Sequence, residues 1–401
     1  MSIFQGLRVL DVASFVAGPA AATILADFGA DVLKVEPPGS GDPYRQITRL
    51  ANLPQAQQNY AWTLASRSKR GIAIDLTRPE GQQLLYGLVA QADVFITNFP
   101  PRVRAKLGID WERLAEINPR LVYASLTGYG ETGPEADRPG FDVHAYWARS
   151  GLADLVRTSA DTPPASPAFG MGDQPTAAIL YGAIVTALYQ REKTGRGGRV
   201  RTSLIASGVW ANGPSVQAVL CGGMVPRRLP REQARSALTQ SYRCRDGRWL
   251  ILSIVDEQRD WPVLAQALGL PQLVDDPRFA GSAERQQNVQ ALLAALDAGF
   301  ACADAADWQQ RLADKRLTAA VVARTEDSVH DAQMRAAGAL VRSAHVAATG
   351  LEVDSPFHVE GVVKTPPGRA PELGEHTTEV LRAQGLTPAQ IAALRAAGVV
   401  Q

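Results

Sequence analysis

Cysteine and net charge are the features that this sequence has least of. Its 401 residues include three cysteines, Cys221, Cys244 and Cys302, with no CxxC pair. An odd and widely spaced set argues against both a disulfide framework and structural zinc, and it fits a reducing cytosol. Lys and Arg number 41 against 40 Asp and Glu. The net charge therefore gives no reason to expect nucleic acid or a membrane surface as a partner.

Long hydrophobic runs are missing as well. No segment reaches the roughly 18 apolar residues that a membrane-spanning helix needs, and the first residues do not join a charged stretch to a long apolar one. The GxGxxG fingerprint is absent from the first strand-to-helix turn, which disfavours a nicotinamide-binding Rossmann enzyme. With 46% hydrophobic residues the chain can bury one large core or two, and its length favours two domains. We expect a soluble, cytoplasmic α/β protein.

Strand and helix patterns alternate over the first part of the chain. Apolar runs predict strands at residues 7–12, 32–36, 72–76, 94–96, 121–126 and 199–204. Helices are predicted between them, at residues 20–28 and from a Thr77 cap to residue 91. The first strand, helix and strand span about thirty residues, so the two strands are predicted to be parallel.

The character of the sequence changes after residue 211. Glycines and prolines among several arginines make residues 212–235 resemble a linker. A hairpin over residues 242–253 is predicted to turn at Asp246-Gly247, and helices follow at residues 261–268, 288–300 and 307–314. This part is interpreted as a smaller α+β unit, after which the chain rejoins the first domain near residue 328.

One acidic residue stands at the start of the most regular helical pattern. Apolar residues recur at three- and four-residue spacing after Pro175, and Thr194-Gly195 ends the pattern. Asp173 is then the N-cap or the residue just outside the helix. A simple capping role is one interpretation, since Asp is a common N-cap. A nucleophile is the other, because Gly172 and small residues surround the carboxylate and Lys and Arg are absent from the four residues on either side.

Polar and basic residues follow the strand at 94–96. Asn98 and Phe99 come at its carboxyl end, where open α/β sheets bind ligands, although a turn residue and a core aromatic would look the same. Arg102, Arg104 and Lys106 come next, and they are either a solvated helix face or a phosphate-binding group.

A set of ordered motifs indicates a family. The sequence contains, in this order, LRVLDVASFVAGP, LADFGADVLKVEPPGSGD, SKRGIAIDL, DVFITNF, LGID with INPRLVYASLTGYGETGP, FGMGD, EKTGRGGRV and LGEHT. Together they resemble the class III coenzyme A transferase family, which includes formyl-CoA transferase, carnitine CoA-transferase and the α-methylacyl-CoA racemases. The likeness covers essentially the whole chain, and it is much weaker for the substrate than for the superfamily.

The resemblance implies a fold and an assembly. The expected large Rossmann-like domain comprises residues 1–211 and 325–401, and a small α+β domain comprises residues 225–324 after a linker at 212–224. The resemblance also implies a homodimer whose two subunits are threaded through each other.

The resemblance further implies a reaction between an acyl-CoA donor and a carboxylic acid acceptor. The Asp that matches Asp173 attacks the thioester, and a mixed anhydride and then an aspartyl-CoA thioester form. Such a site needs an ionised carboxylate, N–H donors for the oxyanion and the exclusion of water. We expect Asp173 to be ionised at its helix start. CoA is then a substrate, and no metal is expected.

Contacts to CoA carry over from the family one by one. The segment around Val16 and Ala17 is expected to hold the pantetheine end, and Asn98 and Phe99 match a strand-end pair that contacts CoA. Lys106 stands where relatives carry an Arg, and Pro37 replaces an Arg seen in some relatives. Arg45, Arg70 and Arg104 are the candidates to compensate for that loss.

Two departures from the family bear on the activity. The racemases carry a His in a Gly-His-Asp segment, which here is Gly140-Phe141-Asp142, and Phe cannot move a proton. His144 is the remaining candidate for a racemase, and a CoA-binding protein without transfer activity is the other alternative. Residues 253–261 lack the glycine run of formyl-CoA transferase, which argues against oxalate and formate as substrates.

Five aromatic side chains predict an acyl pocket that is larger than one for formate. The substrate candidates are Phe15, Phe141 and Tyr146, and Tyr44 and Trp147 belong to the same set of aromatics.

Overall fold

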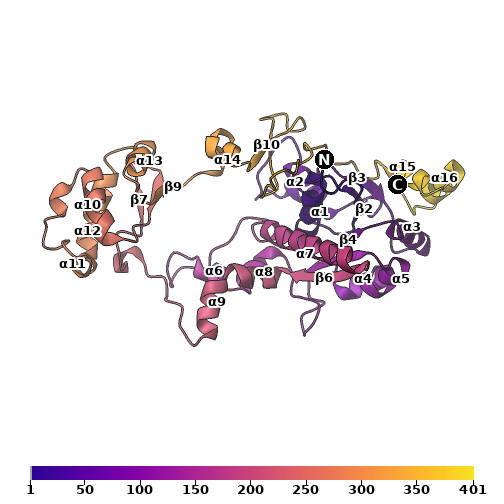
Figure 1. Cartoon of the computed structure of the whole chain (residues 1–401), viewed down its shortest axis with the longest axis horizontal. Coiled ribbons are helices and arrows are strands. Elements are labelled where there is room, and N and C mark those ends of the chain that lie inside the picture. Colours follow the sequence, from indigo (N-terminus) through magenta and orange to yellow (C-terminus); the bar gives the residue numbers. More distant parts are fainter. Residues whose placement is uncertain (1) are drawn as a thin grey trace. The chain divides into compact units, whose positions relative to one another are not determined.

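The computed structural model describes residues 2–401, which form two compact units. The first unit comprises the chain up to Val156 together with Pro164–Val225 and Ala332–Gln401, and the second comprises Arg157–Pro163 and Pro226–Asp331. Figure 1 shows that both ends of the chain lie in the first unit. Each unit has its own hydrophobic core.

Six parallel strands form the centre of the first unit, in the order β3-β2-β1-β4-β5-β6. The strands are β1 (Arg8–Asp11), β2 (Asp31–Glu36), β3 (Arg70–Ala73), β4 (Val94–Thr97), β5 (Val122–Thr127) and β6 (Gly198–Ser203). This confirms the α/β class and the parallel pairing of β1 with β2. The strand order reverses between β1 and β4, and open parallel sheets bind ligands beyond the carboxyl ends of the strands at such a point.

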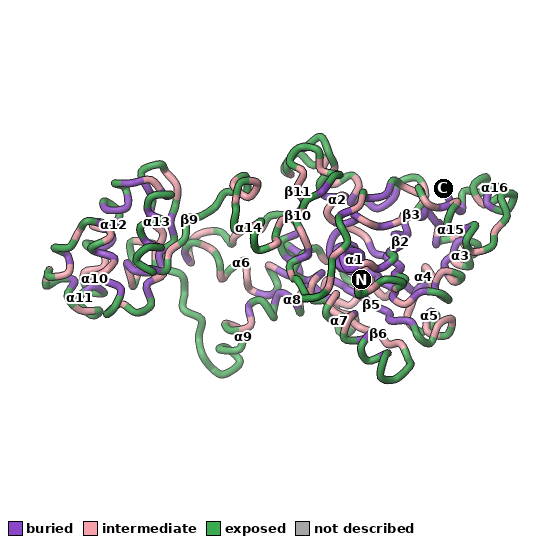
Figure 2. The backbone as a smooth tube through the Cα atoms, turned by 45° about the horizontal axis from the view of Figure 1, so that its top comes forward, coloured by how far each residue is buried: buried purple, intermediate pink, exposed green. Residues whose placement is uncertain are grey.

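Helices cover both faces of this sheet, because successive residues of a buried strand point to opposite faces. One face packs on α1 (Ala17–Asp27) and α7 (Asp173–Thr194). The other packs on α3 (Pro79–Val89), α5 (Trp111–Ile117), α15 (Thr377–Ala383) and α16 (Pro388–Ala396). Figure 2 shows that the residues of β2 and β3 are mostly buried. Just beyond β3, Ile74 forms an antiparallel β-bridge with Val400.

The first unit contains further helices and strands. They are α2 (Tyr60–Ser66), α4 (Pro101–Leu107), α6 (Leu152–Leu155), α8 (Leu204–Ala211), α9 (Gly213–Leu220), α14 (Ala332–Ala336), and the hairpin of β10 (Leu340–Arg342) and β11 (Leu351–Val353). A π-helical turn at Val143–Ala148 precedes α6.

Several expected element boundaries differ from the structure, among them the end of β3 at Ala73 and the start of α10 (Glu257–Ala267) at Glu257. Helix α7 begins at Asp173 with Gly172 as its N-cap, so Asp173 lies inside the first turn. Helix α1 begins at Ala17, three residues before the expected start, because its first turn is made of small buried residues. Thr77 does not cap α3: its hydroxyl donates to Asp75, and Arg78 takes the N-cap position. Part of the expected linker is also helical, since α9 occupies Gly213–Leu220.

The second unit packs four helices around a small sheet. Its elements are β7 (Ser241–Arg243), β8 (Trp249–Leu252), α10 (Glu257–Ala267), α11 (Ser282–Gln287), α12 (Val289–Phe300), α13 (Ala305–Asp314) and β9 (Ala319–Val321). The predicted hairpin is confirmed: β7 and β8 are antiparallel, and Gly247 turns between them with φ of 78°. The third strand β9 and the helix α11 were not expected.

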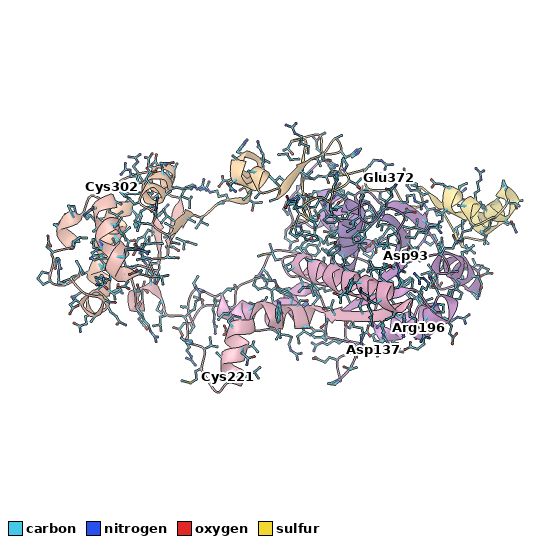
Figure 3. The ribbon with its side chains drawn as sticks, in the orientation of Figure 1. Asp93, Asp137, Arg196, Cys221, Cys302 and Glu372 are labelled. Carbon is cyan, nitrogen blue, oxygen red and sulfur yellow. The ribbon has the colours of Figure 1, made fainter. Side chains whose placement is uncertain are left out.

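Within residues 2–401, no single helix is both long and apolar enough to cross a bilayer. Helices α12 and α13 are long and apolar enough only together, and that pair is bent by 109°. Cys244 is buried, Cys221 and Cys302 are exposed (Figure 3), and all three are free thiols.

Candidate active site

A cavity of about 180 Å³ opens beyond the carboxyl ends of β1, β4 and β5. This is the point at which the strand order reverses. Most of the predicted site residues line it: Asp173, Val16, Ala17, Asn98, Phe99 and the aromatic pair Phe15 and Phe141. The sheet topology explains the convergence, because the segments after parallel strands meet at one edge of the sheet.

The carboxyl group of Asp173 enters the cavity from the first turn of α7. The side chain is half-buried and makes no capping hydrogen bond, so the simple capping interpretation is wrong. Within residues 2–401 it has no ion-pair partner closer than 4.0 Å. Burial, together with the negative charge of Asp142, raises the pKa of Asp173 to about 7. The expectation of a fully ionised carboxylate is therefore corrected, because burial and a like charge outweigh the helix start.

Asp142 is the acidic partner that the sequence reasoning missed. It is buried, and its side chain accepts hydrogen bonds from the N–H of Val143 at 2.7 Å and from the N–H of Gly172 at 3.1 Å. The second bond ties the π-helical turn to the residue before Asp173. The sequence signal for Asp142 is the Gly140-Phe141-Asp142 segment, which keeps the acidic residue of the racemase motif.

The backbone of residues 14–17 forms the wall of the cavity next to α1. Asn98 holds this wall from β4: its side chain accepts from the N–H of Ser14 at 2.9 Å and donates to the carbonyl of Ser14 at 2.6 Å. The Asn98 side chain thus fixes the protein's own backbone. Helix N-termini leave their first N–H groups without intrahelical partners, and in the described chain the N–H groups of Val16 and Ala17 accordingly have no acceptor.

The predicted substrate aromatics divide into two groups. Phe15 and Phe141 line the cavity and meet edge to face, with ring centroids 5.6 Å apart. Tyr146 is not in the cavity wall: it is buried behind Gly172, where a Cβ on that glycine would lie 2.6 Å from the ring. His144 is exposed and does not line the cavity.

The arginines proposed for the CoA phosphates are held by carboxylates. Arg70 lies at the amino end of β3, away from the cavity, and pairs with Asp31 and Glu379. Arg104 is buried against Glu131 at 2.6 Å. Neither guanidinium lines the cavity, so a contact of either one with the CoA phosphates stays a prediction. Arg45 is engaged in the same way, by Glu36 at 2.7 Å.

Two further cations lie at or near the cavity. Lys106 is exposed on α4, a helix that begins directly after the cavity residues Phe99 and Pro100. Arg138 lines the cavity itself, was not predicted, and pairs with Glu135. It follows Asp137 (Figure 3), whose side chain accepts from the N–H of Arg102 at 3.0 Å. Clusters of His, Cys, Asp and Glu that could hold a metal ion were not found within residues 2–401.

Comparison with known proteins identifies the family. The model of CoA-transferase family III matches residues 4–377. The chain belongs to CoA-transferase family III. The (R)-2-hydroxy-4-methylpentanoate CoA-transferase of Clostridioides difficile is 30% identical over 387 residues, which are 96% of each chain. The succinyl-CoA:glutarate CoA-transferase of Mus musculus is 30% identical over 95% of this chain and 86% of its own length.

A solved structure of a relative has a similar fold. The CAIB/BAIF family protein from Brucella suis has a TM-score of 0.84 and 29% identity to this family III chain, over 96% of this chain and 99% of that one. The resemblance drawn from the sequence motifs is thus confirmed. As a family III member this protein is an enzyme of the CoA-transferase type, with CoA thioesters as substrates.

Proposed function

We propose that this enzyme moves CoA from an acyl-CoA donor to a carboxylic acid acceptor through covalent intermediates on Asp173. One observation carries the proposal: a half-buried carboxyl group at a helix start, without a cap bond or a cationic partner, lines a cavity next to the unpaired N–H groups of Val16 and Ala17.

The reaction proceeds in balanced steps. An oxygen of the Asp173 carboxylate attacks the thioester carbonyl, the carbon–sulfur bond breaks, and CoA leaves as a thiolate beside a mixed anhydride. The thiolate then attacks the aspartyl carbonyl, which releases the donor acid and leaves an aspartyl-CoA thioester. The acceptor carboxylate attacks that thioester, and the same two steps in reverse give acceptor-CoA and regenerate Asp173.

Each step places negative charge on a carbonyl oxygen. The N–H groups of Val16 and Ala17 are the donors proposed to stabilise this oxyanion, as fixed backbone donors do in acyl transfer. Phe15 and Phe141 limit the access of water, which protects the anhydride from hydrolysis. Asn98 acts by holding Ser14 in place, and Phe99 forms the wall at the end of β4.

The phosphates of CoA need cations outside the cavity. Arg138 and Lys106 are proposed for this role, since Arg138 lines the cavity and Lys106 is exposed on α4 beside it. Phosphate favours Arg for its two parallel donors, whereas Lys acts as a point charge.

Trapping the covalent intermediate tests the proposal. The enzyme is incubated with succinyl-CoA, treated with borohydride or hydroxylamine, digested, and analysed by mass spectrometry. The peptide that contains Asp173 is expected to carry the modification, and Asp173→Asn is expected to lose both the label and turnover while it remains folded. Labelling of another residue, or normal turnover in Asp173→Asn, would refute the mechanism.

Racemase activity is the weaker alternative. His144 is the candidate for the second proton carrier, and it is exposed and outside the cavity lining. Exchange of the α-proton of a 2-methylacyl-CoA in deuterated water, without CoA transfer, would favour it. Absence of CoA exchange between succinyl-CoA and a panel of acids would instead favour a CoA-binding protein without transfer activity.

The assembly and location are proposals as well. We propose a cytoplasmic homodimer of interlocked subunits, with residues 1–211 and 325–401 as the large domain and residues 225–324 as the small one. The dimer is supported by apolar side chains that are exposed on α8, α9 and the segment after them, among them Trp210, Leu220 and Met224. Three free cysteines fit a reducing compartment.

A further inference from the structure

The loop between β1 and α1 is held in place by four side chains that reach its backbone. Asp11 accepts from the N–H of Ala13 at 3.2 Å, and Lys34 donates to the Ala13 carbonyl. Asn98 brackets Ser14, and Asp42 accepts from the N–H of Phe15 at 3.1 Å. The next two residues are Val16 and Ala17, the proposed oxyanion donors.

Asp42 and Lys34 form a buried ion pair behind this loop. The Lys34 Nζ lies 2.9 Å from Asp42 Oδ2, and both side chains are almost completely buried. Asp11 joins the cluster at 3.8 Å from the same amine, and Lys69 lies 2.8 Å from Asp11. Buried ion pairs are costly to desolvate, and they are weak evidence for stability. A cluster of this kind next to a ligand cavity therefore suggests a role in geometry.

The backbone that Asp42 holds is strained. Phe15 has φ of +60°, in the left-handed region that non-glycine residues rarely adopt. Besides the N–H of Phe15, Asp42 Oδ1 accepts from the N–H of Tyr44 at 2.9 Å. Phe15 lines the cavity together with Asp173.

We propose that Asp42 is a positioning residue for acyl transfer. Fixed by Lys34, it holds Phe15 in the left-handed conformation and so keeps the N–H groups of Val16 and Ala17 in the wall of the cavity that Asp173 lines. Asp42 acts through the loop and touches no reacting atom. This inference rests on the proposed function, because it assigns those N–H groups to the oxyanion.

Two double variants separate the hydrogen bond from the buried charge. Lys34→Met with Asp42→Asn removes both charges and keeps a carbonyl acceptor for Phe15 and Tyr44. Lys34→Met with Asp42→Leu also removes the acceptor at similar volume. Both double variants lose the contacts of Lys34, so a difference in labelling rate between them reports on the hydrogen-bond acceptor at residue 42. The control is Asp27→Asn with Arg67→Met, another buried pair at 2.8 Å whose members do not line the cavity.

The measurements are the melting temperature, the rate of Asp173 labelling by succinyl-CoA, and kcat and KM. Removing one oxyanion donor costs about 100-fold or more in kcat. We therefore expect the Leu variant to label at least about tenfold more slowly than the Asn variant. KM for succinyl-CoA is expected to change by less than about threefold, and the control is expected to lose thermal stability with normal labelling.

The outcomes distinguish this inference from the function on which it rests. Equal labelling rates in the two double variants would overturn it, and so would folding of the Asn variant without folding of the Leu variant, because Asp42 would then hold the fold rather than the loop. Absence of any label at Asp173 in the wild-type enzyme would overturn the proposed function itself.

Discussion

The carboxyl group of Asp173 combines two requirements that oppose each other. As the proposed nucleophile it needs a dry cavity to protect an acyl anhydride, yet the same burial and the nearby charge of Asp142 raise its pKa to about 7. A nucleophilic carboxylate must be ionised. The enzyme is thus expected to work with a carboxylate that is only partly charged near neutral pH.

The rate of Asp173 labelling by an acyl-CoA is therefore expected to rise with pH. The raised pKa means that the reactive anion is lost as the pH falls, so the rate at about pH 6 is expected to be roughly one tenth of the rate at about pH 8 and above. Single-turnover labelling over this range gives the midpoint. A flat profile would contradict the raised pKa of the nucleophile.

Two substitutions of neighbouring carboxylates test what raises the pKa of Asp173. Asp142→Asn removes the like charge, so the midpoint is expected to move to lower pH by about half a unit to one unit. Asp137→Asn is the matched control, because Asp137 is exposed and makes no contribution to the pKa of Asp173. An unchanged midpoint in Asp142→Asn would leave burial as the only cause.

At the scale of elements, the start of α7 determines where Asp173 lies. Gly172 packs directly on Tyr146, and the N–H of Gly172 is bound by Asp142. A larger residue there has no free space. The start of α7 and the π-helical turn that carries Tyr146 therefore pack closely only because residue 172 is a glycine.

Gly172→Ala is expected to destabilise the protein and displace the nucleophile. The added Cβ would lie 2.6 Å from Tyr146 Cγ, and such overpacking costs about 1–3 kcal/mol. Asp173 labelling is expected to slow by at least about tenfold, since small displacements of reacting groups are costly. Thermal unfolding and single-turnover labelling measure the two effects.

A second glycine of the same region serves as the control. Gly182 is exposed within α7, and its added Cβ would meet nothing within 4 Å. Gly182→Ala is expected to stabilise the helix by about 0.5–1 kcal/mol, because Ala has the higher helix propensity. Equal melting temperatures for the two variants would argue against the fitted helix start.

The elements predictable from the sequence are those with strong local patterns. The strands from β1 to β6, the end of α7 at Gly195 and the β7–β8 hairpin all follow from apolar runs and glycine positions. Less predictable were the start of α1, whose first turn is made of small buried residues, and α9, which lies in a glycine- and proline-rich segment. The start of α1 depends on burial in the tertiary structure, which local propensity does not encode.

The residues of the candidate site were also predictable only in part. Asp173, Val16 and Asn98 follow from motifs at strand ends and a helix start, and the structure brings them to one cavity. The roles of charged residues depend on partners distant in sequence. Arg70 and Arg104 look available for phosphate until Asp31 and Glu131 are seen to bind them.

At the scale of the whole molecule, the most exposed apolar side chains of the first unit lie in one stretch of the chain. Trp210 in α8 is 81% exposed, Leu220 at the end of α9 is 73% exposed, and Met224 in the segment after α9 is 91% exposed. Exposed apolar groups of this size indicate an interaction surface. The proposed homodimer supplies a partner of the right chemistry, namely a second copy of the chain.

Interlocked subunits predict an assembly that does not dissociate on dilution. Threaded chains separate only when they unfold, so light scattering and mass photometry are expected to give the mass of two chains down to nanomolar protein, and the denaturation midpoint is expected to rise with protein concentration. Trp210→Ser with Leu220→Ser is expected to lower that midpoint at fixed concentration, whereas Ile3→Ser, also exposed at 60%, is expected to leave it unchanged. A monomer that appears reversibly on dilution while it keeps its native circular dichroism would exclude threading, because folded subunits would then be able to part.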